Sequence, residues 1–188
     1  MRTYRTFIAV LLSPELKSRI ALIQQKFRHI HCDVKWTAEE NLHITLKFLG
    51  DVQEDMLSEV CSAVEKAAVG FAPFDLEIKG AGAFPNTRKP QIIWVGVESG
   101  GEKLAKLAAS IEDELSLLGF EREKKRFSAH ITIGRVKSPK GMEALSQAIQ
   151  SAGKEDFGTQ HIESAMVMTS DLRPTGPVYT AASEIKLN

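Results

Sequence analysis

The sequence predicts an α+β fold of two lobes related by a pseudo-twofold axis, each a small, mostly antiparallel sheet backed by helices, with a cleft between them. Three observations support this expectation. Strand-like and helix-like hydrophobic patterns alternate along the 188 residues. The same order of elements occurs twice, and a stretch rich in glycine and proline separates the two copies near the middle of the chain. We expect residues 1–188 to form a single domain in which the two lobes interleave.

The first expected strand and helix follow one another directly. Residues 7–12 form an apolar run whose length suits a strand that is buried on both faces. Ser13 and Pro14 then provide a helix N-cap and a first helical position. Apolar residues at spacings of three and four carry this helix to about Ile30.

The next expected strand covers residues 41–49, where apolar and polar side chains alternate. A second helix is expected over about 54–69, and a short strand over 74–78. Residues 80–90 hold the densest cluster of turn-forming residues, so we interpret them as a loop that joins the two lobes. The core face of the strand at 41–49 consists of four apolar residues, namely Leu42, Ile44, Leu46 and Phe48.

The second half repeats this order of elements. A shift of 87 residues superposes the strands of the two halves, and an internal duplication is the economical explanation. The shift matches Phe7 with Trp94, Ile8 with Val95, Val10 with Val97, His43 with His130 and Thr45 with Thr132. The expected elements of the second half are strands over 92–97, 128–136, 162–169 and 178–185, and helices over about 102–118 and 140–150.

The composition argues against several classes of protein. Lysine plus arginine number 24 and aspartate plus glutamate number 24, so the formal net charge is zero, which disfavours a broad basic nucleic-acid-binding surface. The two cysteines, Cys32 and Cys61, belong to no metal-spaced cluster, so we expect reduced, buried thiols. The apolar run at 7–12 is too short for a signal peptide or a membrane span. We therefore expect a cytoplasmic protein that does not associate with membranes.

Two matching tetrapeptides carry the chemical content of the sequence: His43-Ile44-Thr45-Leu46 and His130-Ile131-Thr132-Ile133. On a strand, residues two apart share a face, so each imidazole lies beside a threonine hydroxyl. If the lobes face each other about a twofold axis, both pairs meet in one cleft. Near neutral pH, one imidazole can then take a proton from water while the other donates a proton to a leaving oxygen. The two hydroxyls can bind phosphate oxygens. One such tetrapeptide alone would be ordinary strand surface, but two copies at the repeat spacing indicate a phosphate-handling site.

With these motifs, the sequence resembles the 2H phosphoesterase superfamily, and within it the bacterial and archaeal RNA 2′,3′-cyclic phosphodiesterases, historically called 2′-5′ RNA ligases. The resemblance covers nearly the whole chain, with one departure at Ala129, where many members carry proline. The segments that carry it are Arg5–Val10, Trp36, Asn41–Gly50, Pro90–Val97, Phe127–Val136 and Ser170–Tyr179.

This resemblance implies that a terminal 2′,3′-cyclic phosphate on RNA, or a cyclic nucleotide, is opened to a 2′-phosphomonoester without metal or cofactor. It makes His43 the general acid that protonates the departing 3′ oxygen and His130 the general base that activates water. Thr45 and Thr132 bind the phosphate. A metal site built on the two histidines would need a further carboxylate or cysteine, and none is evident at a workable spacing. We expect a monomer.

Two cationic residues near the motifs have an open interpretation. Arg135 matches a phosphate-binding arginine of relatives, but strict strand alternation places it on the face opposite His130, so the role requires a twist or bulge at Gly134. The alternative is a surface arginine. Lys47 shares strand parity with His43 and could reach an RNA phosphate at the mouth of the cleft, or it is a solvated lysine near a strand end.

Other candidates have more ordinary explanations. A basic run before the second motif is more consistent with a solvated turn than with an RNA guide: Arg122, Lys124, Lys125 and Arg126. Four aromatic residues could stack on a base but are first expected in the core: Phe7, Phe48, Phe84 and Trp94. Three histidines lack a paired threonine and are interpreted as non-catalytic: His29, His31 and His161.

Two rival functions remain open at this point. The first is RNA ligation that joins tRNA halves through a 2′-5′ bond, which the same acid and base would perform in reverse. The second is a non-catalytic module that binds RNA ends. A binding module needs hydroxyls and cations but not two titratable groups in symmetric positions, so the duplicated histidines favour an enzyme.

Overall fold

The structure is a computed structural model that describes residues 2–174 and 176–188. Met1 and Thr175 lie outside the described residues, and Thr175 belongs to the C-terminal segment that carries part of the resemblance. Within the described ranges, no helix combines the length and the apolar character needed to cross a membrane.

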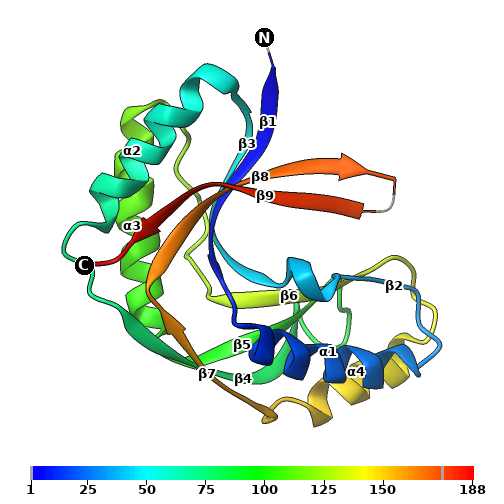
Figure 1. Ribbon diagram of the computed structural model, residues 1–188. Helices are drawn as coiled ribbons and strands as arrows, with labels where there is room; N and C mark the ends of the chain where they lie inside the picture. The colour runs from blue at the N-terminus through cyan, green and yellow to red at the C-terminus, as the bar shows by residue number, and fades with distance from the viewer. Residues whose placement is uncertain (1, 175) are drawn as a thin grey trace.

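A single antiparallel sheet of nine strands runs through the described part of the chain (Figure 1). Its strand order is β7-β4-β5-β6-β3-β1-β8-β9, and β2 pairs with β6 outside this path. The strands are β1 (Thr3–Leu11), β2 (Val34–Trp36), β3 (His43–Gln53), β4 (Phe74–Phe84), β5 (Ile92–Ser99), β6 (His130–Val136), β7 (Asp156–Ile162), β8 (Ser164–Arg173) and β9 (Gly176–Lys186).

In the part of the chain that the structure describes, four α-helices cover the sheet in two groups: α1 (Pro14–Arg28), α2 (Leu57–Ala68), α3 (Gly101–Leu117) and α4 (Met142–Ser151). Helices α2 and α3 lie side by side, with α2 against β8 and β9 and α3 against β3 and β5 (Figure 1). Helix α1 packs on β7, and α4 packs on β4. Each group therefore combines a helix from the first half of the sequence with one from the second half.

The two halves of the sheet meet where β3 pairs with β6 at Ile44 and Ile131. These residues are 87 positions apart, so they are equivalent under the duplication expected from the sequence. An antiparallel pairing of two equivalent residues is the arrangement that a twofold axis between them produces. Both side chains are fully buried in the core. The two-lobed α+β fold expected from the sequence is confirmed.

The predicted shift is wrong for the first strand of each half. In β1, Val10 lies opposite Ile44, whereas in β5 the residue opposite Ile131 is Val95. The structural shift between β1 and β5 is therefore 85 residues, and Val97 is not the counterpart of Val10. The difference arises because the connection from β5 to β6 is two residues longer than the connection from β1 to β3.

The predicted loop at 80–90 is also partly wrong. Strand β4 continues to Phe84, so the irregular segment is limited to residues 85–91. The glycines in β4 serve close packing instead of a turn. A Cβ atom built on Gly82 would lie 2.3 Å from the indole of Trp94, which covers this position from β5. At Gly82 the glycine signal was therefore produced by an aromatic neighbour across the sheet, whereas Gly80 has a positive φ of 76° at a register shift between β4 and β5.

The first strand and helix match their prediction. Strand β1 is buried on both faces: Ile8 and Val10 belong to the main core, while Phe7 packs with residues of β8 in a second apolar cluster. The N-cap of α1 is Ser13, whose hydroxyl oxygen accepts a hydrogen bond from the amide of Leu16 at 3.2 Å. Both cysteines are free thiols, but they are half-buried and not fully buried as expected.

Candidate active site

A cleft of about 670 Å³ opens between the strands at the centre of the sheet and the β8–β9 hairpin. It is lined by residues from β1, β2, β3 and β6 and from both strands of the hairpin. All five site residues predicted from the sequence line this one cavity: His43, Thr45, His130, Thr132 and Arg135.

The pairing of β3 with β6 explains why the two motifs meet. Ile44 and Ile131 point into the core, so the histidine and threonine on either side of each isoleucine point to the opposite face. Because the strands are antiparallel, His43 lies across from Thr132, and Thr45 lies across from His130. Two imidazoles and two hydroxyls therefore alternate around one point of the cleft.

The two histidines are oriented in the same way. His43 Nδ1 lies 2.7 Å from the carbonyl oxygen of Asn41, and His130 Nδ1 lies 2.7 Å from the carbonyl oxygen of Ser128. A carbonyl oxygen only accepts hydrogen bonds, so each Nδ1 carries a proton and donates it. Each Nε2 is then the atom available for proton exchange. His43 Nε2 lies 3.0 Å from Thr45 Oγ1.

Aromatic rings enclose both imidazoles. The Phe7 and Tyr179 ring centroids lie 5.0 and 5.4 Å from that of His43, with Tyr179 edge-on. Phe84 approaches His130 edge-on at 5.1 Å. Burial lowers the pKa of both imidazoles, and the hydrogen bonds to the backbone carbonyls oppose this only in part.

Nearby charges lower these pKa values further. Burial has the largest effect on the pKa of His43, and the positive charges of Lys17 and His130 lower this pKa further. The guanidinium of Arg135 acts in the same way on the pKa of His130. In the free protein both imidazoles are therefore mainly neutral at pH 7, with a lone pair on Nε2.

A β-bulge turns Arg135 into the cleft. The register between β5 and β6 shifts between Ile93 and Trp94, so that Ile133 is an extra residue on β6. The bulge reverses the alternation after Thr132, and Arg135 lies on the same face as the histidines. The twist or bulge that the sequence required at this point is present. A Cβ atom on the next residue, Gly134, would lie 2.8 Å from Val34 Cγ1, which explains the need for glycine there.

The same irregularity occurs in β3 and overturns two expectations. The register of β3 with β1 shifts between Ile8 and Ala9, so both Leu46 and Lys47 point into the core. Lys47 does not reach the cleft mouth and is not solvated either, since its side chain is 3% exposed. Phe48, expected in the core, instead lines the cleft with 44% of its surface exposed.

Lys47 forms a buried ion pair with Glu112 of α3 at 2.8 Å and donates a second hydrogen bond to the carbonyl oxygen of Glu121, also at 2.8 Å. Phe48 packs under the guanidinium of Arg5, whose Cζ lies 4.9 Å from the ring centroid. Of the four aromatic residues considered for base stacking, Phe48 is the one that lines the cleft with an exposed ring, whereas Phe7 is buried beside His43.

The remaining sequence candidates lie outside the cleft. The basic run at 122–126 is exposed, and Arg122 pairs with Asp113. His161 pairs with Asp75 at 2.7 Å, and neither His29 nor His31 lines the cavity. Among the residues that the structure describes, no group of three or more histidine, cysteine, aspartate or glutamate side chains could hold a metal ion.

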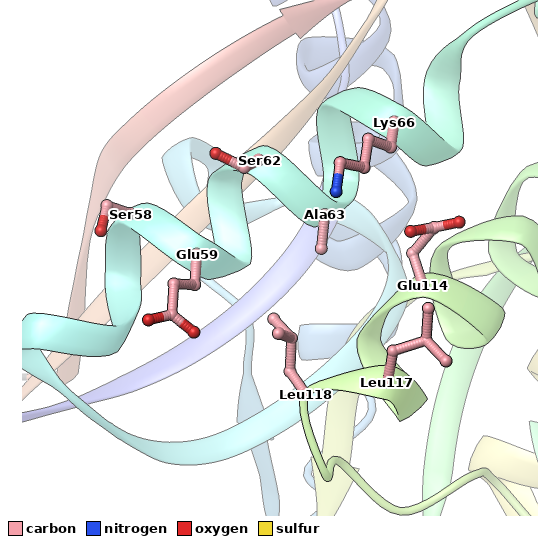
Figure 2. A pocket seen from close by; sticks show the side chains of 8 residues that line it. All are labelled: Ser58, Glu59, Ser62, Ala63, Lys66, Glu114, Leu117 and Leu118. Carbon is pink, nitrogen blue, oxygen red and sulfur yellow. The ribbon is translucent and has the colours of Figure 1, made fainter.

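Several cleft residues had no assigned role in the sequence, among them Arg5, Lys35, Lys137 and Tyr179. Arg5 and Tyr179 belong to segments that carry the resemblance, whereas the signal for Lys35 is the sheet register, which pairs it with Arg135 and which no local pattern reveals. A separate hollow of about 270 Å³ lies between α2 and α3 (Figure 2). Its lining combines Glu59, Lys66 and Glu114 with leucines, and it contains no histidine.

Comparisons with known proteins agree with the duplication seen in the sequence. The family model described as LigT like Phosphoesterase matches the chain twice in succession, at residues 10–94 and 95–179. The RNA 2′,3′-cyclic phosphodiesterase of Thermotoga maritima is 38% identical over 185 residues, which cover 96% of this chain and 94% of the relative. The protein of the same name from Methanothermobacter thermautotrophicus is 35% identical over 183 residues, with coverage of 97% and 98%.

Solved structures show the same fold. The crystal structure of TT0787 of Thermus thermophilus aligns with a TM-score of 0.81 at 28% identity and covers 97% of each chain. The structure of E. coli LigT complexed with 3′-AMP aligns with a TM-score of 0.79, covering 100% of this chain and 99% of that one. At 20% identity, this second likeness concerns the fold alone.

Proposed function

The chain belongs to the LigT-like phosphoesterase family, and from this premise we propose that it hydrolyses the 2′,3′-cyclic phosphate at an RNA end to a 2′-phosphomonoester. The observation that carries the proposal is the convergence of two His-x-Thr pairs in one cleft, with both Nε2 atoms available. An in-line displacement at phosphorus needs a base on the side of the attacking water and an acid on the side of the leaving oxygen. Two imidazoles related by a twofold axis meet this requirement.

In the proposed reaction, His130 Nε2 removes a proton from a water molecule as the water oxygen bonds to phosphorus. The bond between phosphorus and the ribose 3′ oxygen breaks, and protonated His43 transfers its Nε2 proton to that oxygen. The products are a 2′-phosphomonoester and a free 3′ hydroxyl. His43 is left neutral and His130 protonated, and proton exchange with solvent restores the starting forms. No residue changes its oxidation state.

The threonines and Arg135 would stabilise the charge that grows on the non-bridging oxygens. Thr45 is coupled to the protonation of His43, because its hydroxyl lies within hydrogen-bond distance of Nε2. The hydroxyl donates to a neutral imidazole but accepts from a protonated one. Protonating the acid therefore frees the hydroxyl hydrogen to bind a phosphate oxygen, so the reactive form of His43 and the phosphate-binding form of Thr45 occur together.

Product analysis tests the proposed function. We expect a 2′,3′-cyclic nucleotide to be converted to the 2′-phosphate, with the same rate before and after treatment with EDTA, because the described residues offer no cluster of metal ligands. Chromatography against authentic 2′- and 3′-phosphates identifies the product. Formation of the 3′-phosphate would contradict the assignment of the 3′ oxygen as leaving group, and loss of activity in EDTA would contradict the two-histidine mechanism.

The electrostatic role of Arg135 gives a second prediction. Replacing it in an Arg135→Gln variant removes a positive charge that lowers the pKa of His130, so this pKa should rise, and the pH limb of kcat/KM set by the base should move to higher pH. NMR titration of the two imidazoles in the free protein measures the shift directly. The pKa of His43 should change less than that of His130, because Arg135 is not among the groups that perturb it directly and acts on it only through the charge of His130.

The matched control for this titration is Lys137→Gln, which removes one positive charge from the same cleft. Lys137 does not contribute to the lowered pKa of His130, so that pKa should be the same as in the unmodified protein. An equal rise in both variants would mean that the pKa of His130 responds to the total charge of the cleft and not to Arg135 specifically.

A further inference from the structure

Three cationic side chains form a row along the edge of the cleft where β2 pairs with β6: Lys35, Arg135 and Lys137. Lys35 lies directly across from Arg135 in the antiparallel register, so both side chains are on the same face. Lys137 follows Arg135 by two residues, which places it about 6.6 Å further along the chain. All three are exposed and line the cavity that contains the histidines.

This row is not neutralised by the protein. Within residues 2–174 and 176–188, none of the three cations lies within ion-pair distance of a carboxylate. The single acidic residue among the residues described as lining the cleft is Glu40. In a chain whose net charge is zero, three unpaired cations in a row produce a local positive potential at one edge of the cleft.

The bulge at Ile133, directly before Gly134, creates the row. By reversing the alternation of β6, it brings Arg135 to the cleft face, and it aligns Lys35 and Lys137 with Arg135. The close contact of Gly134 with Val34 and Trp36 holds β2 against this point of β6. Lys35 and Arg135 are therefore fixed by strand pairing, and Lys137 follows directly after the end of β6, where its amide donates to the carbonyl oxygen of Asp33.

We propose that Lys35 and Lys137 bind the phosphodiester backbone of the nucleotides on the 5′ side of the cyclic phosphate, so that the preferred substrate is the end of an RNA strand and not a free cyclic nucleotide. This inference rests on the proposed function. Arg135 lies on the same face of β6 as His130 and Thr132 and would contact the cyclic phosphate itself, while Lys35 lies beside it on β2 and Lys137 lies two residues beyond it.

The basic run at 122–126 does not offer a comparable set of unpaired cations along the cleft. Its residues line a different hollow, in which Glu121 and Glu123 alternate with them, and Arg122 is paired with Asp113. This second group of lysines therefore supplies a matched control. The Lys124→Gln/Lys125→Gln variant removes two exposed positive charges outside the cleft, as many as the Lys35→Gln/Lys137→Gln variant removes inside it.

The test compares two substrates with the same terminal nucleotide: adenosine 2′,3′-cyclic phosphate and an oligoribonucleotide that ends in it. For the Lys35→Gln/Lys137→Gln variant, kcat/KM on the oligonucleotide should fall about tenfold at low salt, through KM, while turnover of the mononucleotide is unchanged. The slope of log kcat/KM against log salt should become shallower by about 1.4, because each single-strand phosphate contact contributes about 0.7. The Lys124→Gln/Lys125→Gln control should change neither value.

An equal loss of kcat/KM on both substrates would overturn the proposal, because the lysines would then act at the terminal phosphate. Unchanged kcat/KM on both substrates would also overturn it. Failure of the proposed function has a different signature, namely no turnover of either substrate by the unmodified protein. In that case fluorescence anisotropy with the oligoribonucleotide still tests whether the two lysines bind the RNA backbone. Weaker, less salt-dependent binding in the Lys35→Gln/Lys137→Gln variant supports this role, and unchanged binding refutes it.

Discussion

His43→Ala and His130→Ala should each lower kcat for a 2′,3′-cyclic nucleotide by about 10²–10⁴-fold, because each removes one of the two proton-transfer groups. Their Nδ1 atoms are fixed by carbonyl oxygens, and no other imidazole among the described residues lines the cleft to replace them. The two losses should not multiply in the double variant, because an acid and a base that act in one step form a unit. Steady-state kinetics on the three variants measure the effect.

The control for this experiment is His161→Ala. His161 is exposed and pairs with Asp75 away from the cleft, so its removal should leave kcat unchanged. Circular dichroism should show all variants folded, because the side chains of His43 and His130 face the cleft and not the core. If either cleft variant retained full activity, two-histidine catalysis would be wrong, and a module that only binds RNA ends would become the better explanation.

Lys47→Ala should lower the free energy of unfolding by about 2–3 kcal/mol, because it leaves Glu112 without its partner in a largely buried ion pair. The expected loss is below the range of about 3–5 kcal/mol for fully buried pairs, since the Glu112 side chain retains 21% exposure. Lys26→Ala is the matched control. It breaks a lysine-glutamate pair at a similar distance, but with side chains that are 65% and 38% exposed, so its cost should be less than about 1 kcal/mol. Urea denaturation measures both values.

The pH dependence of this loss provides a further check. Burial by itself raises the pKa of Glu112, but the hydrogen bonds from Lys47 and the Glu123 amide, with the charges of Lys47 and Arg122, lower it overall. A carboxyl whose folded pKa is lowered contributes stability above its unfolded pKa of about 4.3 and loses it as the pH falls through the folded value. The difference between the unmodified protein and Lys47→Ala should therefore be constant near neutral pH and shrink in acid. A difference that persists undiminished in acid would mean that the lysine stabilises the fold through packing alone.

Much of the fold could be predicted because hydrophobic period and helix boundaries are local properties of the sequence. The strand-helix-strand order and the N-cap at Ser13 follow from patterns within a few residues, and the equivalence of Ile44 and Ile131 follows from the repeat. The convergence of the two motifs also follows, because a twofold axis between the two lobes brings equivalent residues of both strands to the same cleft.

The two bulges could not be predicted, and they account for the main errors at the site. A bulge adds a residue to one strand without any change in that strand's own composition, so its period-two alternation still looks regular in the sequence. Lys47 and Phe48 were therefore each assigned to the wrong face. Arg135 was the exception, because its unfavourable parity itself pointed to an irregularity at the preceding glycine, Gly134.

The pseudo-twofold axis has a consequence for the direction of the chemistry. A site assembled from two equivalent halves would accept a substrate equally well in either orientation, and acid and base would exchange roles at random. A cyclic phosphate is opened at one chosen oxygen only if the halves differ. Phe48 and Arg135 occupy equivalent backbone positions after equivalent bulges, yet one presents an apolar ring and the other a guanidinium. Reaction polarity would then depend not on the duplicated framework but on the few positions where its two copies have diverged.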